Sequence, residues 1–283
     1  MNCQEKNMNI IDVPTCYYEQ FDADYTLDVP AEGYGGWKKT LLPLNLEKTA
    51  LAVMHAWDCG TYEQYPGWYR AVEYIPRSAQ ICKNIFPRLL TVIRSKGIKV
   101  FHVCAGDNGY YKKYEGYNIA KDLVCKYNIK KSKPETIDKS AINDKAYDNL
   151  IRFKKELGSH NQPDIERGFA NIDFAPEAKP VGNEGIAEDS DQLFALCRYY
   201  DINHLIYIGF AINWCLLLSP AGMFEMSQRG LICSTIKEAV TAVENKETAR
   251  YELCKEEGLW RTALAFGFVY EIDDLLNAIS GSQ

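Results

Sequence analysis

The chain has 283 residues, of which 47% are hydrophobic and 25% charged, and it carries a net charge of −6. This composition is typical of a folded globular protein and excludes a disordered chain. Binding of an acidic protein to nucleic acid or to an anionic membrane releases few counterions, so we expect no nucleic-acid partner and no membrane partner. No apolar run approaches the roughly 20 residues of a membrane span.

The pattern of residues changes along the chain. Residues 1–45 are rich in Tyr, Gly and Pro and predict an N-terminal arm of extended pieces and turns. Residues 46–283 predict one domain in which short apolar strands alternate with helices. The predicted strands are 49–56, 98–105, 204–211, 230–236 and one that begins at 268. The predicted helices are 77–97 (closed by Gly97), 190–201, one just before 230, 247–267 and one that ends near 279.

An insertion interrupts this alternation from about residue 106 to residue 180. It is rich in Lys, Tyr and Asn and predicts one amphipathic helix near 142–157. Its apolar content is too thin for a separate core, so we interpret it as part of the surface of the domain. The order of elements elsewhere predicts an α/β fold: a three-layer α/β/α Rossmann-like sandwich around a mostly parallel sheet of about six strands. In such a fold the ligand site lies at the carboxyl ends of the strands.

The sequence contains ten cysteines and four histidines. No two cysteines are spaced as CxxC, most lie in apolar stretches, and the first residues hold no apolar signal-peptide core. We therefore expect reduced thiols and a cytoplasmic location. The histidines are scattered along the chain, so we expect neither a metal site nor another cofactor.

One of these cysteines follows a strand that should end at the ligand site. In GFAINWCLLLSPAG (209–222) the strand ends at Phe210 and Cys215 begins the next helix. The helix dipole and free backbone N–H groups would favour the thiolate and would stabilise an oxyanion formed when the sulfur attacks a carbonyl. On position alone, Cys215 is equally well interpreted as one more buried thiol.

Three blocks of the sequence together resemble the isochorismatase-like cysteine hydrolases. IYIGFAINWCLLL is similar to the family block that carries the nucleophile, KNIFPRLLTVIRSKGIKVFHV to its first helix and second strand, and TALAVMHAWDCG to its first strand. The resemblance covers about residues 46–105 and 175–280 and is greatest to a divergent branch of the family. It implies the fold described above, a small-molecule substrate and Cys215 as the nucleophile.

The other two members of the family's Asp-Lys-Cys triad are not found at their expected positions. His55 stands where the Asp is expected, and Asn183 falls near the Lys position; Lys179 would fit only after a shift of about four residues. His55 is interpreted either as a general base for Cys215 or as a space-filling residue of a lapsed active site. In the first interpretation Asp58 either orients His55 or is the surrogate for the family's acid.

Further residues are candidates for binding the substrate. By resemblance, the N–H of Ala211 contributes to the oxyanion hole and the Phe210–Ala211 peptide is a candidate cis bond. Glu188 is a candidate contact to a polar substrate group, although the Glu188-Asp189 pair is also typical of a helix cap. Trp57, Asn183 and Asn213 complete the candidate substrate-binding residues.

The function predicted from these residues is hydrolysis of a small molecule at an amide or related C–N bond by attack of the Cys215 thiolate. The alternative is an inactive isochorismatase-like protein that binds a small ligand or a partner chain. A redox role for Cys215, with Cys59 as the second thiol, is a third interpretation. The resemblance also implies a homo-oligomer, for which the arm and the insertion are the natural contact elements.

Overall fold

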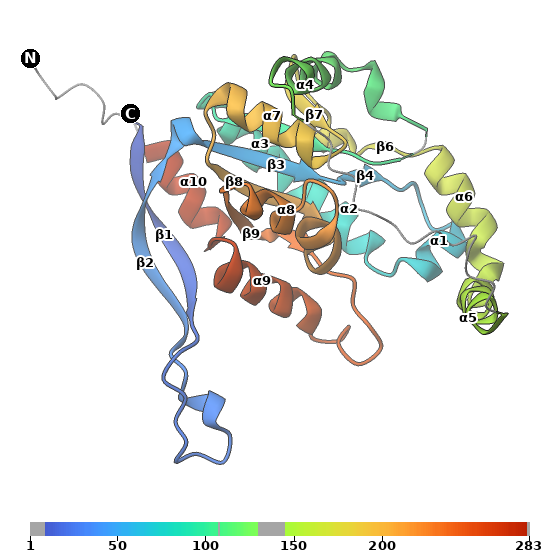
Figure 1. Ribbon diagram of the computed structural model, residues 1–283, viewed down its shortest axis with the longest axis horizontal. Coiled ribbons are helices and arrows are strands. Elements are labelled where there is room, and N and C mark those ends of the chain that lie inside the picture. Colours follow the sequence, from blue (N-terminus) through green and yellow to red (C-terminus); the bar gives the residue numbers. More distant parts are fainter. Residues whose placement is uncertain (1–8, 107, 130–144, 282–283) are drawn as a thin grey trace, which may run out of the picture.

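A central sheet of eight strands organises the protein (Figure 1). The computed structural model describes residues 9–106, 108–129 and 145–281. The order of strands across the sheet is β2-β1-β10-β9-β8-β3-β5-β7. Their bounds are β1 (Ile10–Glu19), β2 (Gly36–Asn45), β3 (Thr49–Met54), β5 (Lys99–Val103), β7 (Gly185–Ala187), β8 (His204–Phe210), β9 (Ile232–Thr241) and β10 (Val269–Tyr270).

The six strands from β3 to β10 in this sheet run parallel to one another. The predicted fold class is therefore confirmed, but the sheet has two more strands than predicted. The additional strands come from the N-terminal arm, where β1 and β2 pair antiparallel over their whole length and β1 joins β10 at the single pair Cys16 and Val269. Figure 1 shows the far end of this two-stranded ribbon extending well beyond the body of the protein.

Helices cover both faces of the sheet and complete the three layers (Figure 1). On one face, α4, α7, α8 and α9 pack over an apolar core. On the other face, α2, α3 and α10 cover a second core. The bounds of these helices are α2 (Ile75–Asn84), α3 (Phe86–Ser95), α4 (Glu115–Lys126), α7 (Ser190–Tyr200), α8 (Met223–Gln228), α9 (Leu253–Ala265) and α10 (Ile272–Gly281).

Most predicted elements lie where the sequence placed them, and one helix is divided. The helix predicted over 77–97 is two helices, α2 and α3, because Pro87 has no N–H to continue the first one and instead occupies the first turn of the second. Gly97, with φ of 70°, ends α3 in the left-handed conformation, as predicted.

The insertion contains more structure than the single helix predicted for it. That helix is α5 (Lys145–Glu156), and its predicted first residues, 142–144, lie outside the described residues. The insertion also contributes α4, α6 (Gln162–Ala170) and the short strand β6 (Asp173–Phe174), which pairs with β4 (Trp57–Asp58). Aromatic side chains from the insertion and from α1 (Pro66–Ala71) share a third apolar cluster. Across the described ranges, no helix has both the length and the hydropathy needed to cross a bilayer.

Candidate active site around Cys215

Cys215 lies at the carboxyl end of β8, near the middle of the sheet. Instead of beginning an α-helix, it belongs to a π-helical turn, η7 (Ile212–Leu216), in which the backbone N–H groups of Trp214 and Leu216 both donate to the carbonyl of Ala211 at 3.1 Å. The Cys215 side chain is half-buried. The peptide bond between Phe210 and Ala211 is cis, which confirms that prediction.

A glycine allows β8 to reach this position. Gly209 has φ of 117°, and a Cβ atom added to it would lie 1.9 Å from the carbonyl oxygen of Met54 on β3. No other residue fits so close to a neighbouring backbone. The sequence Gly209-Phe210-Ala211 therefore brings the strand against β3 immediately before the turn that carries the thiol.

The side chain of Asn213 fixes the same turn to the chain after β9. Its Nδ2 donates to the carbonyl of Val243 at 2.9 Å, and its Oδ1 accepts from the Val243 N–H at 3.0 Å. Both polar atoms of the amide are thus used within the chain. The structure assigns Asn213 this tethering contact rather than the substrate contact expected from the sequence.

His55 follows β3 in the left-handed conformation, with φ of 49°, and is 7% exposed. Its ring stacks on Trp57 with centroids 4.7 Å apart and an interplanar angle of 16°, and its buried Nδ1 has no hydrogen-bond partner. Burial lowers the pKa of His55 to about 4, so the imidazole is neutral at pH 7.

The expected Cys–His pair is not formed. Within the described part of the chain, no hydrogen bond joins His55 to Cys215, and the imidazole stacks on Trp57. Asp58 does not orient His55 either, since its carboxylate accepts the N–H of Gly60 at 3.0 Å and closes a local turn.

Tyr74 lies near the Cys215 thiol and was not predicted from the sequence. It immediately precedes α2, and burial raises the pKa of its phenol, as do the neighbouring charges of Cys215 and Cys59. The phenol therefore remains a neutral hydrogen-bond donor at pH 7. In the sequence, only its position immediately before α2 could have suggested that Tyr74 contributes to the site.

Glu188 and Asp189 follow the carboxyl end of β7 and have different roles. Glu188 accepts hydrogen bonds from the phenols of Tyr111 at 2.9 Å and Tyr117 at 3.0 Å. Asp189 accepts the N–H of Gln192 at 2.9 Å and so caps α7, as the capping interpretation predicted. Glu188 thus has an ordered carboxylate at the same edge of the sheet as Cys215.

Asn183 is not brought to this edge. It precedes β7, which runs parallel to β5, β3 and β8, so it lies at their amino ends while Cys215 lies beyond the carboxyl end of β8. Lys179 is at the same far side, where its carbonyl accepts from Arg94 at 3.1 Å. No group of three or more metal-ligating side chains gathers among the residues that the structure describes.

Comparison with known proteins identifies the fold. A cysteine hydrolase from Pseudomonas syringae pv. phaseolicola 1448A is similar in structure with a TM-score of 0.52 and 13% identity, over 86% of this chain and 97% of that chain. The chain has the isochorismatase-like fold. No family model matches the sequence, and no curated protein is similar to it.

Other structures with this fold are less similar to the chain. An isochorismatase-like hydrolase from Alkaliphilus metalliredigens has a TM-score of 0.44 and 14% identity, over 82% of this chain and 97% of that chain. A nicotinamidase from Staphylococcus aureus has a TM-score of 0.39 and 15% identity, over 79% of this chain and 98% of that chain. The fold rests on the similarity to the cysteine hydrolase from Pseudomonas syringae pv. phaseolicola 1448A, which at 13% identity establishes the fold alone.

Proposed function

We propose that this isochorismatase-like protein hydrolyses a small molecule at an amide or related C–N bond through Cys215. The observation that supports the proposal is the position of Cys215: a half-buried thiol on a tethered turn at the carboxyl end of a central parallel strand. In open α/β sheets this edge is where ligands bind. The structural similarity to a cysteine hydrolase agrees with this assignment.

The proposed reaction has two steps. The sulfur of Cys215 attacks the carbonyl carbon, the N–H groups of Ala211 and Cys215 receive the developing oxyanion, and the C–N bond breaks as the thiol proton passes to the leaving nitrogen. Water then attacks the thioester, which releases the carboxylic acid and restores the thiol. Tyr74, whose pKa is raised by burial and by the charge of Cys215, is the proposed hydrogen-bond donor to the sulfur anion.

His55 is the proposed base for the first proton transfer. Its Nδ1 is free to accept a proton, and catalytic hydrogen bonds often form only in the substrate complex. Asp58 takes no part in this proposal because its carboxylate closes a local turn. Trp57 and Glu188 remain proposed substrate contacts, the first as an apolar wall and the second as a hydrogen-bond acceptor.

A second candidate function is binding of a small ligand without hydrolysis. It is favoured by the neutral His55, which is stacked away from the thiol and has a pKa lowered to about 4. Burial disfavours its imidazolium form, so proton transfer from a thiol to this ring is uphill until the substrate rearranges the site.

The rate of alkylation by iodoacetamide, measured for each cysteine by mass spectrometry from pH 5 to 9, separates the two candidates. Cys254 is the matched control, because it is also half-buried and lies at the start of α9. If Cys215 reacts about tenfold faster than Cys254 at pH 7, the thiol is activated as proposed. Equal rates for the two cysteines would contradict the hydrolase and leave the binding protein.

A panel of small amides then tests the chemistry itself. Ammonia or amine release by the wild type, abolished in Cys215→Ala, is the expected result. Release that persists in Cys215→Ala would place the reaction elsewhere in the protein.

A further inference from the structure

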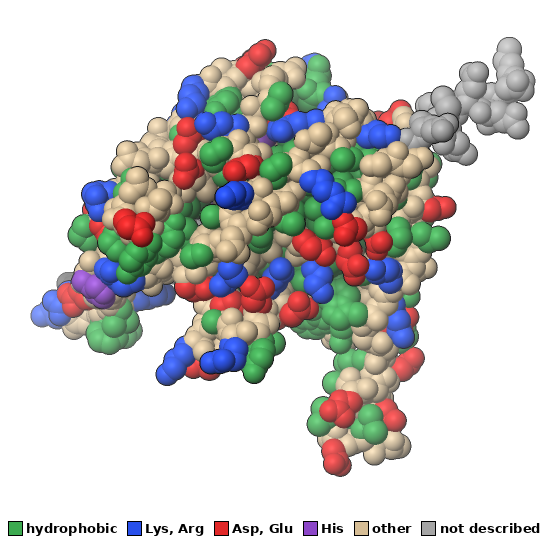
Figure 2. Space-filling view, turned by 180° about the vertical axis from the view of Figure 1, so that it is seen from behind, with side chains coloured by type: hydrophobic (Ala, Val, Ile, Leu, Met, Phe, Trp, Pro, Cys, Tyr) green, Lys and Arg blue, Asp and Glu red, His purple; other side chains and the backbone are tan. Residues whose placement is uncertain are grey.

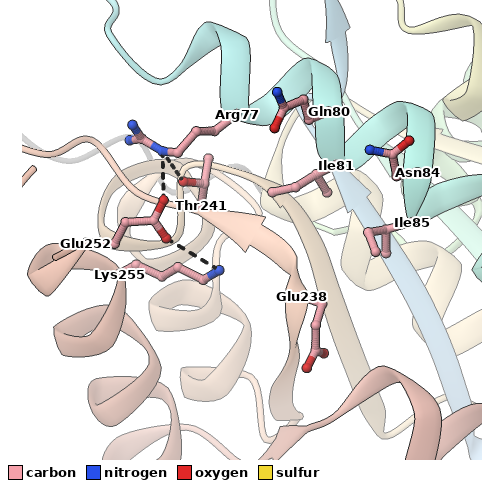
Figure 3. A pocket seen from close by; sticks show the side chains of 9 residues that line it. All are labelled: Arg77, Gln80, Ile81, Asn84, Ile85, Glu238, Thr241, Glu252 and Lys255. Carbon is pink, nitrogen blue, oxygen red and sulfur yellow. Dashed lines mark hydrogen bonds and ion pairs between the residues drawn. The ribbon is translucent and has the colours of Figure 1, made fainter. Parts of the chain in front are cut away.

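The projecting end of the N-terminal arm is acidic and exposes apolar side chains. Residues 20–35, here called the arm end, contain four acidic residues and no Lys or Arg. They also expose the large apolar side chains of Phe21 (59%), Tyr25 (87%), Leu27 (40%) and Val29 (53%). In the space-filling view, red and green side chains gather at this end of the molecule (Figure 2).

The arm end is folded rather than loose. Asp24 accepts hydrogen bonds from the backbone and the hydroxyl of Thr26 at 2.9 and 2.7 Å, and the Asp24 N–H donates to the carbonyl of Pro30 at 3.0 Å. At the base of the arm, Trp260 of α9 donates to Gln20 at 3.0 Å. A preorganised projection with exposed apolar groups loses little entropy on binding, as expected of a contact element.

The outer edge of β2 is poorly suited to bind another strand. The strand contains Pro43, which lacks an N–H, and Lys38 and Lys39, which pair with Glu19 and with Glu271 and Asp274. Lysine and proline are the residues with which proteins protect exposed sheet edges from pairing. Contact through the arm end is therefore favoured over pairing along the ribbon.

A cationic, tyrosine-rich surface lies on the face of the molecule covered by α4 and α7. We call it the Lys–Tyr surface, and each of its cations lies over a tyrosine ring, at 4.3 to 5.9 Å from the ring centroid. Its cations are Lys99, Lys112, Lys113, Lys121, Lys126 and Arg198, and its rings are Tyr111, Tyr114, Tyr117, Tyr127, Tyr199 and Tyr200. All six cationic residues are exposed.

The Lys–Tyr surface carries an excess of positive charge on a chain whose net charge is −6. The acidic residues of the helices that form it are Glu115 and Asp122 on α4 and Asp191 on α7, and Asp191 pairs with Arg229. Glu188 lies against the same surface, where it accepts from the phenols of Tyr111 and Tyr117. Lys113 also pairs with Asp173 at 3.5 Å. The remaining cations are held over the tyrosines and face solvent.

The arm end and the Lys–Tyr surface of one chain do not meet. In Figure 1 the arm extends from the β1–β2 edge of the sheet, whereas α4 and α7 lie at the opposite edge, against β7. Their charges are complementary, and each offers an exposed aromatic ring, Tyr25 on the arm end and Tyr199 on the Lys–Tyr surface. A contact between them therefore has to join two copies of the chain.

We propose that the arm end of one copy docks on the Lys–Tyr surface of a second copy. In a twofold dimer the contact occurs twice, since each copy offers one arm and one surface. The acidic side chains of the arm end face the exposed cations, and Tyr25 and Phe21 pack among the tyrosines. This proposal does not depend on the activity of Cys215.

The test is the oligomeric state of the full chain, measured by sedimentation velocity from 1 to 100 μM in 50 and 500 mM NaCl. We expect a wild-type dimer that dissociates more readily in high salt. Reversal of the surface charge in Lys121→Glu with Lys126→Glu should weaken the dimer at least tenfold, and Asp22→Lys with Asp28→Lys in the arm end should do the same.

The four substitutions combined in one chain should restore the dimer, because the charges are then complementary again. Lys154→Glu with Lys155→Glu on α5 makes the same charge change elsewhere and should leave the dimer unchanged. Thermal unfolding of every variant shows whether its fold is kept.

Three outcomes would overturn the proposal. The first is a wild-type monomer at all concentrations. The second is an oligomer that neither charge reversal weakens, which would mean that another face is used. The third is a dimer that is weakened by the surface reversal but not by the arm reversal, since some other acidic segment would then occupy the Lys–Tyr surface.

Discussion

Replacing His55 by Phe should change how the stability of the protein depends on pH. The imidazole is 7% exposed, and burial lowers its pKa from 6.5 to about 4. Between these values the unfolded chain binds a proton that the folded chain does not, so the free energy of unfolding falls as the pH falls. Phe keeps the ring stacked on Trp57 but cannot bind a proton.

The magnitude follows from the same two values. At pH 5 the pH is about 1.5 units below the pKa of the imidazole in the unfolded chain. The free energy of unfolding of the wild type is therefore about 2 kcal/mol lower at pH 5 than at pH 7.5. His204, whose pKa burial also lowers to about 4, makes a similar contribution in both proteins. The His55→Phe variant should therefore lose about 2 kcal/mol less than the wild type over this range.

Urea unfolding at pH 7.5, 6.5 and 5, followed by tryptophan fluorescence and far-UV circular dichroism, measures this difference. The exposed His160 provides the matched control, and His160→Phe should behave as the wild type does. If His55→Phe and the wild type lose the same free energy of unfolding on acidification, the imidazole is not held neutral in the folded protein. His55 would then be able to bind a proton before the substrate is present.

Three further substitutions test the packing around the sheet. Glu184→Ala should lower the free energy of unfolding by about 2 to 3 kcal/mol in a urea titration, because it leaves the guanidinium of Arg94, bonded to Glu184 at 2.7 and 2.9 Å, without its carboxylate partner. Gly209→Ala should yield little folded protein by circular dichroism, since its Cβ would lie 1.9 Å from the Met54 carbonyl; a cooperative, wild-type-like melt would contradict this. Asn213→Ala should cost about 1 to 3 kcal/mol and reduce the alkylation rate at Cys215 several-fold, whereas an unchanged rate would show that the tether does not shape the thiol site.

Five strands of the sheet, β3, β5, β8, β9 and β10, could be predicted because their signal is local. The apolar runs at 49–56 and 204–211 became β3 and β8, whose side chains are buried throughout. The division of the helix over 77–97 was missed because its apolar spacing continues past the break at Ile85, although Pro87 marks it. The helix α4 was missed because much of its buried face consists of Gly116, Tyr117 and Ala120. These residues do not give the regular spacing of large apolar side chains that predicts a helix.

The placement of Cys215 could be predicted, but its surroundings could not. The thiol follows a strand in a recognisable block of sequence. The orientation of the His55 ring depends instead on its stacking with Trp57, and the indole of Trp57 is held by a hydrogen bond to Tyr110 at 2.9 Å. Asn183 was expected at the site because it falls near the Lys position of the family that the sequence resembles, whereas the parallel strand β7 begins after it and leaves it at the amino ends of the strands. A side-chain contact thus determines the first outcome, and the position of a short strand determines the second.

The protonation states of His55 and Tyr74 indicate which groups can stabilise a Cys215 thiolate. His55 is neutral because burial lowers its pKa to about 4, and Tyr74 is a neutral phenol, so neither residue supplies a positive charge to stabilise a thiolate at pH 7. The stabilisation then depends on the backbone N–H groups of the turn η7 and on a hydrogen bond from the phenol. Because that stabilisation requires a fixed turn, loss of the tether between Asn213 and Val243 should affect the reactivity of the thiol more than loss of the Asp58 carboxylate, which accepts the Gly60 N–H, does.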